Sequence, residues 1–255
     1  MDVKDIINSL LVWFGELGRF VARLSHTAFT RPFEGRELIR QLDEIGSKSF
    51  ALVALAGAAT GAVLAMQTRA SMSRFGAKSL LPAVIIFSLV KETGPVITGL
   101  VLSGRIGAGI GAELGSMKVT EQIDAMTASA VDPYKFLAAT RILACIVALP
   151  LLTVTADFFG IISGWVASTL SEPISLHLFI ERGMKNVSFD DFLFPTFKTA
   201  IFGLIIGVIA CFQGMRTEGG TAGVGRAVTR AVVVSSLFII LADVLLVRVM
   251  VIFFS

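Results

Sequence analysis

The sequence has 255 residues, of which 55% are hydrophobic and 16% are charged. Soluble domains carry about 45–50% apolar and about 25% charged residues, so this composition excludes a typical water-soluble enzyme and a disordered scaffold. An all-α integral membrane protein fits best, because a helix satisfies its own backbone hydrogen bonds in lipid. The net charge of +3 is too small to indicate a nucleic-acid partner.

An amphipathic helix is predicted at the amino terminus. Apolar residues recur at three- and four-residue spacing between Val3 and Val21, so a helix gathers them on one face. We expect this helix to lie in the headgroup region of a membrane, with Trp13 near the boundary. A soluble amphipathic helix packed on a partner is the alternative. Residues 1–48 form this interfacial or elbow region, and residues 49–255 form a domain of five spans.

Five membrane-spanning helices are predicted, because about 20 apolar residues cross a bilayer. The first occupies the uncharged run at residues 49–68. The second is interrupted, because Lys91 and Glu92 separate two uncharged runs that are each too short to cross alone. The charged pair must therefore lie within the membrane or near its edge. The other spans are expected at residues 136–170, 199–215 and 231–255, with polar connections at 171–191 and 216–230.

Small and acidic residues inside the spans predict how the helices pack. Glycines four residues apart let another helix approach closely. Three such pairs occur, at Gly57 and Gly61, at Gly160 and Gly164, and at Gly203 and Gly207. Asp157 and Asp243 are single acids in apolar spans, and either could belong to a proton relay. Since neither has a titratable partner at helical spacing, we interpret both as interhelical hydrogen-bonding sites.

Glu92 is the first candidate for a functional residue within a span. An ionisable group there is costly, so Glu92 is expected to face a cavity or a partner. A structural charge satisfied by a neighbouring span is the alternative. Adjacent Lys91 points about 100° away around a helix, so the two side chains need not pair. The following Gly94-Pro95 removes one backbone donor and can kink the helix, which frees carbonyls toward a polar cavity.

A short polar helix is predicted at residues 117–126, between the second and third spans. It combines a hydrophilic surface with apolar contacts from Met117, Val119, Ile123 and Met126. Such a helix suits a membrane subunit that receives force from a soluble motor, and an ordinary solvated loop helix is the alternative. The chain has no Gly-Lys-Ser or Gly-Lys-Thr for a nucleotide-binding loop. Without such a loop, the energy for any transport must come from a partner protein or an ion gradient. We also predict no catalytic residue and no metal site.

The distribution of basic residues predicts the orientation. Lys and Arg are more numerous in the segments that share a side with the amino terminus. Because cytoplasmic segments carry the excess of these residues, we expect a cytoplasmic amino terminus and an external carboxy terminus. The first residues, from Met1 to Asp5, lack the basic region and apolar core of a signal peptide.

The stretch from Lys91 to Pro133 resembles the signature of the MlaE (YrbE-type) permease family, the membrane subunits of MCE-associated phospholipid ABC transporters. Two motifs carry the resemblance, Glu92-Thr93-Gly94-Pro95 and Met117-Lys118-Val119-Thr120-Glu121-Gln122. The family commonly has Arg-Glu-Leu-Gly-Pro in the first motif, so Lys91 and Thr93 depart from it while the acid and Gly-Pro remain. With the interfacial helix and five spans, the resemblance covers most of the chain.

The resemblance implies a homodimer whose first and second spans frame a lipid cavity, open toward the periplasm of a bacterial inner membrane. A cytoplasmic ABC ATPase would bind the ATP and dock between the second and third spans, so no cofactor is expected on this chain. A periplasmic MCE-domain protein would exchange phospholipid with the cavity, and a small cytoplasmic accessory protein is a further partner. The implied cavity residues are Leu64, Met72, Phe75, Lys91 and Glu92. The implied coupling element, in a helix at about 116–130, comprises Lys118, Thr120, Glu121, Gln122 and Asp124.

Two other classes of function compete with this interpretation. Asp157, Asp243 and the interrupted second span also suit a self-sufficient ion-coupled secondary carrier. Such carriers often have paired repeats with two matching broken helices, whereas this sequence has one interruption. An assembly scaffold without transport is the third hypothesis.

Overall fold

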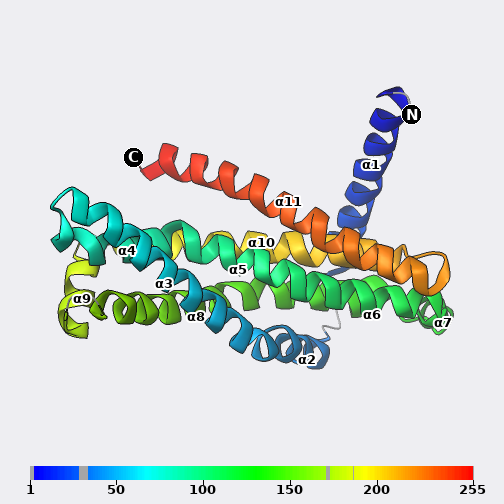
Figure 1. Cartoon of the computed structure of the whole chain (residues 1–255). Coiled ribbons are helices and arrows are strands. Elements are labelled where there is room, and N and C mark those ends of the chain that lie inside the picture. Colours follow the sequence, from blue (N-terminus) through cyan, green and yellow to red (C-terminus); the bar gives the residue numbers. More distant parts are fainter. Residues whose placement is uncertain (1–2, 29–33, 171–172, 186, 255) are drawn as a thin grey trace.

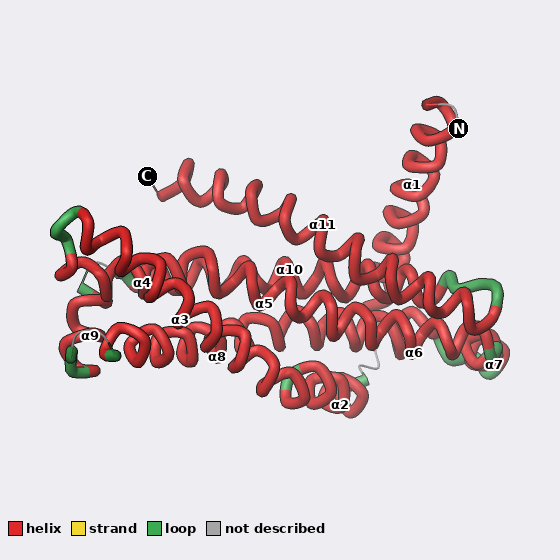
Figure 2. The backbone as a smooth tube through the Cα atoms, viewed as in Figure 1, coloured by secondary structure: helices red, strands yellow, loops and turns green. Residues whose placement is uncertain are grey.

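The computed structural model describes residues 3–28, 34–170, 173–185 and 187–254, and their regular structure is helical (Figures 1 and 2). Five helical stretches are long and apolar enough to cross a membrane. They comprise Gly35–Arg74, Lys78–Val119, Tyr134–Thr169, Phe189–Met215 and Gly220–Met250. The predicted all-α class with five spans is confirmed.

Helix α1 (Val3–Ala28) extends away from the bundle, at a steep angle to the long axis of the bundle (Figure 1). Trp13 and Phe20 pack on the bundle core, whereas Leu11 and Phe14 remain exposed. An apolar exposed face on a helix that runs across the spans is consistent with a position in the membrane interface. Helix α2 (Gly35–Ile45) and the short turn η1 (Ser47–Ser49) then lead into the first span.

The first span, α3 (Phe50–Arg74), packs along α8 (Thr140–Thr169), which continues the π-helical turn η5 (Tyr134–Ala139). A methyl group added at Gly57 would collide with the backbone of Ala156, and one added at Gly61 would collide with the backbone of Gly160. The predicted role of these glycines in close helix packing is confirmed. Gly203 likewise lies against the backbone of Cys145, so the fourth span uses the same device.

We expect Gly61→Val to separate the first and third spans and to lower stability by about 1–3 kcal/mol, the usual effect of overpacking. Thermal unfolding of the detergent-solubilised protein measures the change. Ala59→Val is the matched control, because Ala59 is an exposed residue of the same helix. Equal unfolding temperatures for the two variants would show that the glycine contact is dispensable.

The second span is one continuous helical stretch rather than two short helices. It runs through α4 (Leu81–Ser88), η3 (Leu89–Thr93), α5 (Gly94–Leu102), η4 (Ser103–Gly107) and α6 (Ala108–Val119), after the short turn η2 (Lys78–Leu80). The turns η3 and η4 are π-helical. Pro95 cannot donate a backbone hydrogen bond, and the chain adapts just before it. There the Gly94 N–H bonds to the Leu89 carbonyl, five residues back.

Three boundaries differ from the sequence prediction. Helix α9 (Leu176–Met184) occupies part of the predicted polar connection, and Ser175 caps it by accepting a hydrogen bond from the Leu178 N–H. Helix α10 (Phe189–Met215) begins well before the predicted residue 199, because Ser188 and Asp191 form a capping box at its start. Helix α11 (Gly220–Phe254) begins inside the predicted loop at 216–230. The turn before it has a positive φ at Gly219, and Gly220, the first residue of the helix, also has a positive φ.

Candidate functional site

Charged side chains from three spans meet inside the bundle and form what we call the charge cluster, composed of Lys91, Glu92, Asp191, Lys198 and Asp243. Lys198 Nζ donates a hydrogen bond of 2.8 Å to Glu92 Oε2. The same ammonium lies 2.8 Å from Asp243 Oδ1, as an ion pair without hydrogen-bond geometry. Lys91 Nζ donates a hydrogen bond of 3.1 Å to Asp191 Oδ1. The cluster thus ties η3 and α11 to α10.

The geometry of the helices explains why these charges pair as they do. Successive residues of a helix point in directions about 100° apart, so Lys91 and Glu92 reach different partners. Asp191 and Lys198 lie seven residues apart on α10, which places them on one face two turns apart. The prediction that Lys91 and Glu92 need not pair is confirmed. Lys91 also lies over the Phe87 ring, 4.6 Å from its centroid.

Lys198 is the centre of the cluster, and the sequence analysis missed it. Its side chain is 9% exposed and lies between two carboxylates. Burying an ammonium is strongly unfavourable unless it is paired, and here the pairing is with both Glu92 and Asp243. The fourth span was predicted to begin at residue 199, which left Lys198 just outside it. Asp243 does make a contact with another helix, as predicted. The contact is an ion pair with Lys198 rather than the predicted hydrogen bond.

An apolar groove of about 440 Å³ lies between α10 and α11 and adjoins the charge cluster. Lys198 is the one charged residue among its described lining residues. The others are Phe194, Pro195, Phe197, Ala200, Ile201, Leu246, Val247, Val249 and Met250. An apolar groove with a charged group at its wall fits an amphiphile, whose chain and polar head need different surroundings.

The predicted cavity residues on the first span are placed elsewhere in the single chain. Leu64 packs against the small core cluster that contains Ile85 and Phe179. Phe75 is 80% exposed at the end of α3, and Met72 lines a different pocket at that end of the bundle. The described residues of one chain therefore do not bring these three side chains to Glu92, and their common cavity remains a prediction for the homodimer.

Asp157 differs from the interpretation based on sequence. It is 2% exposed on α8, and neither carboxylate oxygen has a hydrogen-bond partner among the described residues. The carboxylate instead packs closely against Gly94, at the start of α5. The expectation of an interhelical hydrogen bond is therefore wrong for this residue. Within the described part of the chain, no group of three or more His, Cys, Asp or Glu side chains is placed to hold a metal ion.

The predicted polar helix at residues 117–126 is divided in two. Helix α6 ends at Val119, Glu121 adopts a left-handed φ of 59°, and α7 (Gln122–Ala128) follows. We call residues 118–124 the coupling turn. The prediction of a single helix is wrong. The helical periodicity of the sequence does not reveal that one residue, Glu121, adopts a positive φ.

The coupling turn has an exposed polar side and an apolar side. Lys118 Nζ donates hydrogen bonds of 2.9 Å to both carboxylate oxygens of Asp124. The side chains of Thr120, Glu121 and Gln122 are exposed, whereas Ile123 is buried in the core. The five residues of the implied coupling element therefore lie together. The turn lies at the end of the bundle opposite α9 (Figure 1).

The coupling turn is firmly connected to the spans. Helix α6 packs against α10 and α11, with Gly214 of α10 close to Leu114. The fully buried Arg141 of α8 forms an ion pair of 2.7 Å with Glu113 of α6, and it donates a hydrogen bond to the Leu137 carbonyl. A displacement of the turn would therefore move the adjoining half of the second span with it.

Five spans, a charge cluster beside an apolar groove and an exposed coupling turn define a polytopic membrane permease. The profile of the family described as "Permease MlaE" matches residues 38–249. The chain belongs to the MlaE permease family, so the resemblance is confirmed. Membership also confirms the expected class, a transmembrane permease subunit rather than an enzyme.

Three relatives illustrate the similarity. A probable ABC transporter permease protein of Rickettsia typhi is 37% identical over 209 residues, which cover 82% of this chain and 81% of that protein. One from Synechocystis is 33% identical over 249 residues, covering 95% and 94% of the two chains. The chloroplastic protein TRIGALACTOSYLDIACYLGLYCEROL 1 of Arabidopsis thaliana is 33% identical over 211 residues, covering 83% of this chain and 60% of that protein.

Proposed function

We propose that this chain is the membrane subunit of an ATP-driven phospholipid transporter. The observation that carries the proposal is the apolar groove beside the charge cluster, which matches the two chemical halves of a phospholipid. The Rickettsia and Synechocystis relatives are named as probable ABC transporter permeases. The Arabidopsis relative is named after a glycolipid with a diacylglycerol base. The first two names support the ATP-driven transport, and the third supports a lipid as the transported molecule.

The proposed assembly places the parts of the chain on defined sides of a bacterial inner membrane. The amino terminus and the coupling turn face the cytoplasm, where an ABC ATPase and a small accessory protein bind. Helix α9 and the carboxy terminus face the periplasm, where an MCE-domain protein exchanges phospholipid with a cavity between two copies of the chain. The excess of Lys and Arg in the segments on the side of the amino terminus supports this orientation.

The second span suits the transmission of force from the motor to the lipid. It is one helical stretch from the coupling turn to Glu92, about 40 Å long at 1.5 Å per residue. Its two π-helical turns, η3 and η4, are sites where a helix bends readily. A push on the coupling turn would bend the helix at these turns and shift Glu92 relative to Lys198.

Reconstitution tests the proposal directly. In proteoliposomes that contain the chain, its ATPase and its MCE-domain protein, we expect ATP-dependent transfer of a fluorescent phospholipid. The chain alone should transfer none, with or without a proton or sodium gradient. Transfer by the chain alone down an ion gradient would instead support the secondary carrier, to which the unpartnered Asp157 would then contribute.

Glu92→Ala is expected to lower this transfer about tenfold, because a hydrogen bond to a charged group contributes about 1.5–3 kcal/mol. Assembly should be affected less, since Lys198 keeps its ion pair with Asp243. Glu181→Ala is the control, because Glu181 is an exposed acid on α9. Transfer at the normal rate by the Glu92 variant would remove this residue from the site.

A further inference from the structure

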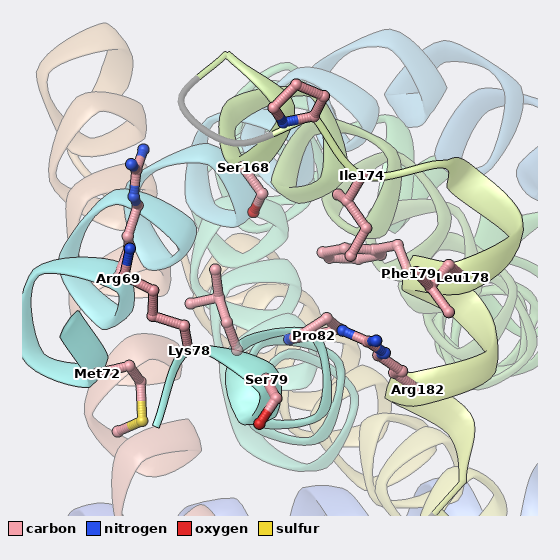
Figure 3. A pocket seen from close by; sticks show the side chains of 12 residues that line it. Arg69, Met72, Lys78, Ser79, Pro82, Ser168, Ile174, Leu178, Phe179 and Arg182 are labelled. Atoms are coloured by element: carbon pink, nitrogen blue, oxygen red, sulfur yellow. The ribbon is translucent and has the colours of Figure 1, made fainter. Parts of the chain in front are cut away.

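A second pocket lies at the α9 end of the bundle, far from the coupling turn. It has a volume of about 270 Å³ and is enclosed by the end of α3, the start of the second span, the end of α8, and α9 (Figure 3). Three basic side chains line it, Arg69, Lys78 and Arg182. Its described lining includes no acidic side chain. We call it the outer basic pocket.

The basic side chains come from separate elements and converge. Arg69 and Lys78 lie on one side of the pocket and Arg182 on the other (Figure 3). Neither Arg69 nor Arg182 forms an ion pair with a described residue, so their guanidinium groups keep their donors for a ligand. The guanidinium groups of Arg69 and Arg182 repel one another across this small pocket, and an anion between them would relieve that repulsion.

Apart from Ser79 and Ser168, the remaining wall of the pocket is apolar, and contacts between the helices hold it in place. Pro82 and Phe179 are buried beneath the basic residues. Helix α9 is held close to α4, because Gly183 lies directly against Ile86. The Trp165 indole N–H donates a hydrogen bond of 2.9 Å to the Ile174 carbonyl, which fixes another part of the wall. The pocket thus combines cationic groups with an apolar base.

We infer that the outer basic pocket binds the phosphate of an anionic phospholipid. A guanidinium group presents paired donors that match the oxygens of a phosphate, and basic pockets between membrane helices suit anionic headgroups. A lipid without a cationic headgroup is favoured, since Arg69 and Arg182 would repel the ammonium of a choline or an ethanolamine. The apolar base accepts the glycerol and the start of the acyl chains. The inference rests on the proposed function only for the claim that the bound lipid is cargo.

The test compares lipid binding by two double variants of the full chain in detergent. Native mass spectrometry measures retention of phosphatidylglycerol and phosphatidylcholine. Arg69→Gln with Arg182→Gln is expected to reduce the preference for phosphatidylglycerol at least about tenfold, since both charged hydrogen bonds to the phosphate are lost. The matched control is Arg74→Gln with Lys185→Gln, two exposed basic residues at the same end that do not line the pocket. The control should keep the wild-type preference.

Several results would overturn the inference. An unchanged preference in the Arg69 and Arg182 variant would do so, and so would an equal loss in both double variants, because general surface charge would then explain the binding. Inorganic phosphate at millimolar concentration is added as a competitor. We expect it not to displace the lipid, and displacement would assign the pocket to free phosphate instead.

A transfer assay on the complete complex separates this inference from the proposed function. ATP-driven transfer together with charge-independent lipid binding would support the proposed function and contradict phosphate binding in the outer basic pocket. Charge-dependent binding without any transfer would support phosphate binding in the outer basic pocket and contradict the proposed function.

Discussion

Lys198→Met is expected to destabilise the protein strongly. The change leaves the Glu92 and Asp243 carboxylates close together without the cation that lies between them. Removing one partner of a buried ion pair typically costs about 3–5 kcal/mol, and the partial exposure of Glu92 places this case near the lower value. Thermal unfolding in detergent measures the loss, and we expect a clear fall in the unfolding temperature.

Two further variants separate charge from packing. Lys198→Arg retains the cation and should keep most of the stability. Combining Lys198→Met with Glu92→Gln and Asp243→Asn removes all three charges and should recover much of it, because no unpaired charge then remains. We expect the neutral triple variant to fold but to transfer lipid poorly. If Lys198→Met alone unfolds at the wild-type temperature, the charge cluster is not structural.

Glu121→Asn together with Asp124→Asn is expected to release the ATPase from the membrane subunit. Both acids are exposed on the coupling turn. Asparagine tolerates the left-handed backbone of residue 121, so the turn should keep its shape while it loses two charges. The fold should survive as well, because an exposed pair such as Lys118 with Asp124 contributes at most about 1 kcal/mol.

Co-purification of the ATPase in detergent measures this effect, and we expect at least a tenfold loss of bound ATPase, the equivalent of about 1.4 kcal/mol. Glu218→Gln is the matched control, since Glu218 is an exposed acid in the turn between α10 and α11. Retention of the ATPase by the double variant would place the docking surface elsewhere. Release by the control as well would indicate that general charge, rather than the coupling turn, holds the motor.

The two ends of the proposed mechanism depend on one another through the second span. The Arg141 ion pair with Glu113 connects the half next to the coupling turn to α8. Lys198 connects the other half, through Glu92, to α10 and α11. Between these anchors lies the π-helical turn η4, and the outer anchor, Glu92, is itself part of η3. π-Helical turns are sites where a helix bends readily. In the proposed mechanism, bending at η4 would let one half of the span move while the other is held, as a lipid gate would require.

Much of this protein could be predicted from its sequence. Composition and uncharged runs determined the class and the number of spans, because the bilayer imposes a minimum length of apolar helix. Glycine spacing identified the contact surfaces of α3, α8 and α10, since close helix packing needs small residues at four-residue intervals. The motifs around Glu92 and Glu121 identified the family, and the independence of Lys91 from Glu92 followed from helix geometry.

Only the tertiary structure decided which charges meet. The partners of Glu92 and Asp243 lie on other helices, and no spacing within one helix reveals that both reach Lys198. The same holds for Asp157, whose neighbour is the backbone at Gly94 rather than a hydrogen-bond donor. Periodicity in a sequence reflects the local hydrogen bonds and the buried face of one helix. The contacts of a buried charge depend on how separate helices are brought together, and so does the outer basic pocket.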